Sequence, residues 1–111
     1  MAKLAQEDIE QRLEKFPEWS LTGDAIQRTL KFDDFVHAMA FVNKVADLAE
    51  RAQHHPDIMV RYSKVTLTVS THDAGGLTEK DFDLATQIDG VAPRSQPKTA
   101  VNPVASKTAK S

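Results

Sequence analysis

Residues 35 to 49 carry the pattern that most restricts the fold, because apolar side chains recur there with the three-to-four spacing of one helix face. The apolar positions are Phe35, Met39, Val42, Val45, Ala46 and Ala49. A face of this kind must be buried against another surface. Asp33 or Asp34 supplies an N-cap, and Pro56 stops the helix near His55. The pattern predicts a long amphipathic helix that covers a second layer of structure.

Alternating apolar and other residues on either side of this helix predict four short strands. After Pro56 the alternating apolar positions are Ile58, Val60, Tyr62, Val65, Leu67 and Val69. Before the helix, residues 19–21 and 25–32 flank a Thr22-Gly23-Asp24 turn and predict a hairpin. Further helices are expected over residues 6–13 and from Thr78 to Gly90. The predicted fold is α+β, a four-stranded antiparallel sheet covered on one face by helices, in the order α-β-β-α-β-β-α.

The length of 111 residues suits one domain, and 41% hydrophobic against 27% charged residues is the balance of an ordinary globular protein. No stretch approaches the roughly 20 apolar residues of a membrane span, and there is no cysteine. Residues 1–90 hold 10 basic and 16 acidic side chains, whereas residues 91–111 hold four basic and none acidic. We expect an acidic domain over 1–90, a disordered basic tail over 91–111, a cytoplasmic location, and neither membrane nor nucleic-acid binding.

Three histidines are the residues best suited to chemistry. His54 and His55 precede Pro56 at the expected helix end, and His72 closes the last expected strand. Histidine exchanges protons near neutral pH, so one such residue can donate a proton while another accepts one. Taken singly, each histidine is better explained as a boundary residue. A metal site ranks well below acid and base catalysis, because adjacent histidine side chains diverge and no cysteine completes a ligand set. His37 receives no role.

The sequence around these histidines resembles that of the pterin-4a-carbinolamine dehydratases over roughly residues 4 to 90. The matching positions are Glu50-Arg51-Ala52-Gln53-His54-His55-Pro56, Tyr62, His72 and Asp81, with the flanking runs 41–46 and 71–78. The resemblance implies dehydration of 4a-hydroxytetrahydropterin, the product left when an aromatic amino acid hydroxylase has used its cofactor. It also implies that neither a metal nor an organic cofactor is needed.

The same resemblance implies roles for individual residues. His54 and His72 are expected to be the main acid and base, in an order left open, with His55 as an orienting or assisting group. The implied substrate-binding residues are Trp19, Glu50, Pro56, Thr71, Asp73 and Ala74. Glu50 is expected to orient His54, four positions further on, or else to be a solvated helix charge. Asp81 is expected to cap the last helix rather than to act in catalysis.

The relatives assemble as homodimers or homotetramers, so a homo-oligomer is expected here. Members of this fold also serve as non-catalytic assembly proteins or as dimerisation cofactors of transcription factors, and that is the alternative function. Retention of all three histidines favours the enzyme, because a scaffold has no need of three titratable groups in one pocket.

Overall fold

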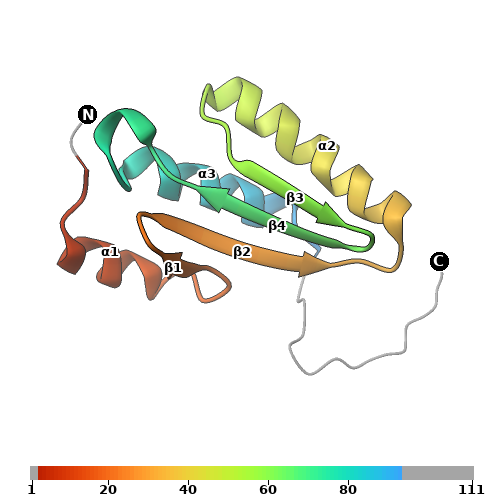
Figure 1. Cartoon of the computed structure of the whole chain (residues 1–111), viewed down its shortest axis with the longest axis horizontal. Helices are drawn as coiled ribbons and strands as arrows, with labels where there is room; N and C mark the ends of the chain where they lie inside the picture. Colours follow the sequence, from red (N-terminus) through yellow and green to blue (C-terminus); the bar gives the residue numbers. More distant parts are fainter. Residues whose placement is uncertain (1–2, 94–111) are drawn as a thin grey trace.

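The computed structural model describes residues 3–93. Its elements are α1 (Gln6–Leu13), β1 (Ser20–Thr22), β2 (Ala25–Lys31), α2 (Phe35–Ala52), β3 (Asp57–Arg61), β4 (Lys64–Val69), a short 3-10 turn η1 (His72–Ala74) and α3 (Glu79–Val91) (Figure 1). The predicted α+β class and element order are confirmed.

The four strands form one antiparallel sheet in the spatial order β1-β2-β4-β3. β4 lies between β2 and β3, and its residue Val65 is opposite Leu30 on one side and Val60 on the other. Along β4 every second residue is buried, as the alternation in the sequence predicts. The sheet therefore has one apolar face and one polar face.

The apolar face is covered by α2 and α3, which lie on the same side of the sheet (Figure 1). Buried residues of both helices pack with the inward residues of β2 and β4, and α1 contributes Ile9 to the same core. On the opposite face the strands carry hydroxyl and amide side chains, and the Thr29 and Thr66 hydroxyls lie 3.0 Å apart. The expected single helical layer is confirmed.

Among the boundaries that differ from the predictions, two involve a left-handed residue. α2 ends at Ala52 rather than near His55, because Gln53 adopts φ 54° and ψ 41° and turns the chain away from the helix axis. Tyr62 has φ 55° and lies in the turn after β3 instead of within the strand. The first of these turns decides where the following histidines lie.

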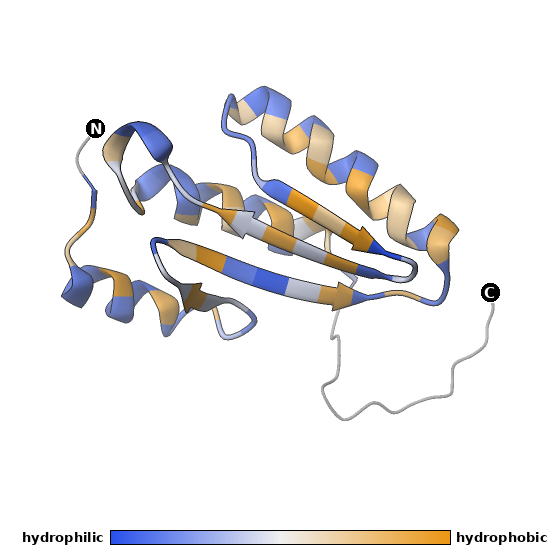
Figure 2. Ribbon diagram, in the orientation of Figure 1, coloured by the Kyte–Doolittle hydropathy of each residue, from blue (hydrophilic) through white to orange (hydrophobic). Residues whose placement is uncertain are grey.

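β3 is an edge strand, and most of its residues are exposed. It carries a run of hydrophobic residues (Figure 2), of which Ile58 and Met59 are exposed. Within residues 3–93, no helix is both long and apolar enough to cross a membrane. The predicted tail, 91–111, lies outside the described residues from position 94 onward.

Candidate active site

The turn at Gln53 sends two adjacent histidines in different directions. The side chain of His54 is only 11% exposed, and its Nε2 lies 2.6 Å from Oδ1 of Asp81 on α3. The side chain of His55 is 61% exposed, and its Nε2 lies 2.7 Å from Oε2 of Glu50. The expectation that Glu50 orients His54 is therefore wrong. The i,i+4 geometry behind it requires a continuous helix, and α2 ends before His54.

Asp81 is fully buried, and both of its oxygens are occupied. Its Oδ2 accepts hydrogen bonds from the Thr71 hydroxyl at 2.8 Å and from the Thr78 backbone N–H at 2.9 Å. Thr78 is the N-cap of α3, so Asp81 completes a capping box, and its predicted capping role is confirmed. Its contact with His54 was not anticipated. Asp81 thus links the start of α3 to a histidine from the end of α2.

The hydrogen-bond network assigns the hydrogen on His54. An ionised carboxylate only accepts hydrogen bonds, so His54 donates through Nε2 to Asp81. This leaves Nδ1 of His54 as the ring nitrogen that can exchange a proton with a bound molecule. The buried carboxylate therefore fixes the orientation of the His54 ring.

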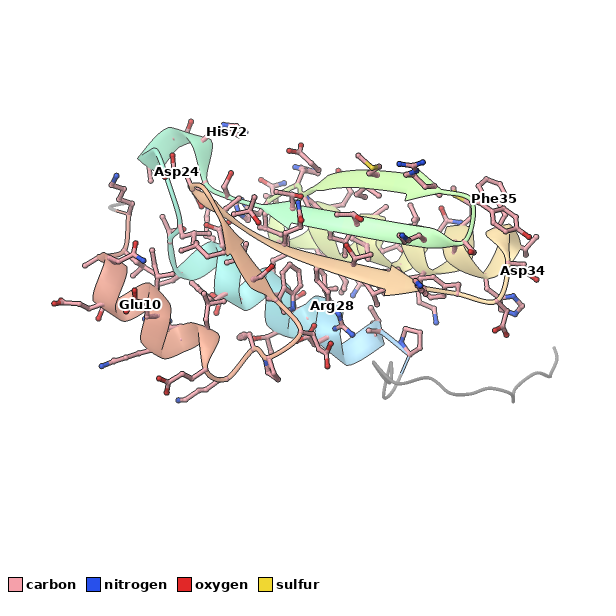
Figure 3. All side chains as sticks on the ribbon, turned by 60° about the horizontal axis from the view of Figure 1, so that its bottom comes forward. Glu10, Asp24, Arg28, Asp34, Phe35 and His72 are labelled. Carbon is pink, nitrogen blue, oxygen red and sulfur yellow. The ribbon has the colours of Figure 1, made fainter. Side chains whose placement is uncertain are left out.

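The three histidines line one open hollow of about 280 Å³. Its lining residues are Gln53, His54, His55, Ser70, Thr71, His72, Asp73 and Lys80. His72 belongs to η1, beyond the end of β4 at Val69, and not to the strand as predicted. An isolated bridge between Thr71 and Gly76 closes this loop. Figure 3 shows His72 at the end of the molecule where β4 leaves the sheet.

Of the other residues expected to bind substrate, the structure places some in the lining of the hollow and others outside it. Thr71 and Asp73 line the hollow, whereas Glu50 reaches it only through His55. Pro56 and Ala74 are neighbours of lining residues in the chain but are not themselves part of the lining.

Trp19 lies elsewhere. It is 5% exposed, and its Nε1 donates to Oδ1 of Asp89 at 2.9 Å. Asp89 follows Asp81 by eight residues on α3, a separation of about 12 Å along the helix. The structure thus places Trp19 in the core and not beside the histidines.

Three lining residues, Gln53, Ser70 and Lys80, were not predicted. Each lies within two positions of a residue that was singled out, so proximity in the chain was the available signal. Their polarity alone did not separate them from other surface residues.

A larger depression of about 660 Å³ lies along α1 and reaches Phe16 and Phe82. It contains no histidine, and its Arg12 is paired with Glu79 at 2.6 Å. Catalysis by proton transfer requires titratable groups that face one another, and only the smaller hollow brings histidines together. The smaller hollow is therefore the candidate active site.

Fold and site together define a small α+β domain with a histidine pocket supported by a buried carboxylate. The family model for pterin 4 alpha carbinolamine dehydratase matches residues 2–91, and the chain belongs to this family. A relative from Acidobacterium capsulatum, provisionally named pterin-4-alpha-carbinolamine dehydratase, is 57% identical over 91 residues, which are 82% of this chain and 99% of the relative.

Two solved structures have a similar fold. The crystal structure of a transcriptional coactivator/pterin dehydratase from Brucella melitensis matches with a TM-score of 0.78 and 31% identity, over 82% of this chain and 99% of the other. A pterin dehydratase-like protein identified as a RuBisCO assembly factor in the alpha-carboxysome matches with a TM-score of 0.53 and 20% identity, over 65% of this chain and 83% of the other. The second likeness concerns the fold alone.

Proposed function

We propose that this protein dehydrates 4a-hydroxytetrahydropterins to quinonoid dihydropterins by histidine acid and base catalysis, without a metal or an organic cofactor. The observation that carries the proposal is the meeting of His54, His55 and His72 in one hollow, with His54 held by buried Asp81. Membership of the dehydratase family supports the same reaction.

The proposed reaction needs two proton transfers and no oxidant. One histidine donates a proton to the C4a hydroxyl, and the C4a–O bond breaks to release water. A second histidine accepts the proton from N5, and the electron pair of the N–H bond completes the C4a–N5 double bond. We assign these two transfers to His54, through Nδ1, and His72, with His55 as the assisting group.

The direct test is the decay rate of enzymatically generated 4a-hydroxytetrahydropterin with the wild type and three single variants. His54→Ala and His72→Ala should each lower the rate by about 100-fold or more, and His55→Ala should lower it less. His37→Ala is the matched control, because this exposed histidine bonds Asp34 and lies outside the hollow. A folded but inactive wild type would refute the dehydratase proposal.

We also propose that the chain forms homodimers or homotetramers. Among residues 3–93, β3 pairs with β4 on one side and with no strand on the other, and such an edge readily pairs with a second strand. Exposed large hydrophobic residues lie on β3, in the turn after it and at the start of α2, namely Phe35, Val36, Ile58, Met59 and Tyr62. Sedimentation at micromolar concentration tests this, and a stable monomer would contradict it.

The alternative is a non-catalytic assembly or coactivator role, since the similar Brucella melitensis protein is described both as a transcriptional coactivator and as a pterin dehydratase. The decay measurement separates the two, since an assembly protein does not accelerate dehydration. For the enzyme we place the reaction in the cytoplasm, after an aromatic amino acid hydroxylase that supplies the substrate.

A further inference from the structure

Lys80 is the one lysine or arginine among the eight residues that line the histidine hollow. It also lines a second hollow of about 150 Å³, together with Ala52, His54, Asp83, Leu84 and Gln87. His54 and Lys80 are the two residues common to both linings. Lys80 thus borders the same two hollows as His54.

The side chain of Lys80 has no hydrogen bond or ion pair within residues 3–93, whereas its backbone N–H donates to Oγ1 of Thr78. The acidic residues on either side of it in the chain are already used. Glu79 accepts hydrogen bonds from the two terminal guanidinium nitrogens of Arg12. Asp81 accepts hydrogen bonds from the His54 ring, the Thr71 hydroxyl and the Thr78 backbone N–H. The ammonium group is therefore available to a ligand.

The position of Lys80 also argues against a purely structural role. It is the second residue of α3, at the end where the helix dipole disfavours a cation. A lysine there contributes no capping interaction through its side chain. Its position does put three hydrogen-bond donors beside the histidine that is held by Asp81.

We propose that Lys80 is a substrate-binding residue that donates a charged hydrogen bond to the 4-oxo group of the pterin ring, an inference that rests on the proposed function. An ammonium group can only donate, so it pairs with an acceptor of the pterin and not with its N–H groups, and the 4-oxo oxygen is an acceptor that lies next to the reacting carbon C4a. This contact holds the ring while the histidines act at C4a and N5. Lys80 is thus a positioning group and not a proton carrier.

The first test measures the KM and kcat of Lys80→Met, Lys80→Arg and the control Lys44→Met, whose lysine is exposed on α2 and outside both hollows. We expect KM to rise about tenfold in Lys80→Met, the loss of roughly one charged hydrogen bond, with kcat changed less than about threefold. Lys80→Arg should recover most of the affinity. An unchanged KM in Lys80→Met would overturn the proposal.

The second test uses binding alone, so that it does not depend on dehydratase activity. Calorimetry gives the dissociation constants of 7,8-dihydropterin and of its counterpart with a 4-amino group in place of the 4-oxo group. The wild type should bind the 4-oxo compound about tenfold more tightly, and this preference should vanish in Lys80→Met. If the preference persists in Lys80→Met, the inference fails. If it vanishes while the wild type shows no dehydration, Lys80 still binds the ring and only the proposed reaction fails.

Discussion

Nε2 of His54 lies 2.6 Å from Oδ1 of Asp81, although 27 positions separate the two residues in the sequence. Asp81 serves two purposes through its two oxygens, since Oδ2 caps α3 and Oδ1 holds the histidine ring. The stability of the helix start and the orientation of His54 therefore depend on one carboxylate.

Asp81→Asn should impair both activity and stability. The amide keeps the shape of the side chain but replaces one acceptor oxygen with an NH2 donor, so either the His54 ring or the cap of α3 loses its acceptor. We expect kcat to fall about 100-fold and the free energy of unfolding to fall by about 1–3 kcal/mol. Rate measurements and urea denaturation check these values. The control is Asp47→Asn, because Asp47 is an exposed residue of α2. A variant with normal kcat would show that Asp81 is a cap only.

Glu50→Gln should have a much smaller effect than Asp81→Asn. Glu50 also bonds a histidine, but the side chains of Glu50 and His55 are 76% and 61% exposed. Solvent screens such a pair, so we expect the free energy of unfolding to change by less than about 0.5 kcal/mol and kcat by less than about threefold. The free energies of unfolding of the wild type and of Glu50→Gln, measured at low and at high salt, test the screening. A loss as large as that of Asp81→Asn would mean that His55 carries a main proton transfer.

Asp89→Ala should destabilise the fold without affecting the site. Asp89 accepts hydrogen bonds from Trp19 and from Arg28, and Arg28 is 6% exposed in the middle of β2. Removal of the carboxylate leaves a buried guanidinium without its partner, which costs about 3 kcal/mol. Thermal unfolding of Asp89→Ala and Arg28→Met tests this, because the second variant removes the buried charge and should lose less. If both variants lose the same stability, the unpaired charge of Arg28 is not the cause of the loss in Asp89→Ala.

The cap of α2 should make stability depend on acidity. The backbone N–H and then the ring of His37 donate to Asp34, and they hold the pKa of Asp34 below its ordinary value of 3.8. Because the folded pKa is the lower one, the ionised cap stabilises the protein above pH 3.8. This contribution is lost as the pH falls through the lowered folded value.

Wild type should therefore have a higher Tm than Asp34→Ala near neutral pH, and the gap should narrow in strong acid. Thermal scans of both proteins across this pH range measure the gap. A gap that stays constant would exclude the carboxylate as its source.

Much of the fold could be predicted because its signals are local. The alternation of Val65, Leu67 and Val69 requires one buried face, and the helical repeat after residue 35 requires a helix against it. The predicted face of that helix was partly wrong: Val45 and Ala49 are buried as expected, but Phe35 is 48% exposed, and Ala38 and Phe41 are buried in addition. The capping function of Asp81 could be predicted for the same reason, since a capping box spans four consecutive residues.

The sequence by itself thus determined the element order, the inward face of β4 and the three histidines worth examining. Only the tertiary structure decided which partners His54 and His55 have. Gln53 ends α2 in a left-handed turn, which removes Glu50 from His54, and the packing of α2 against α3 brings Asp81 to that ring instead. The tertiary structure likewise places Trp19 in the core. Periodicity specifies which face of an element is buried, whereas contacts between side chains of different elements depend on how those elements pack.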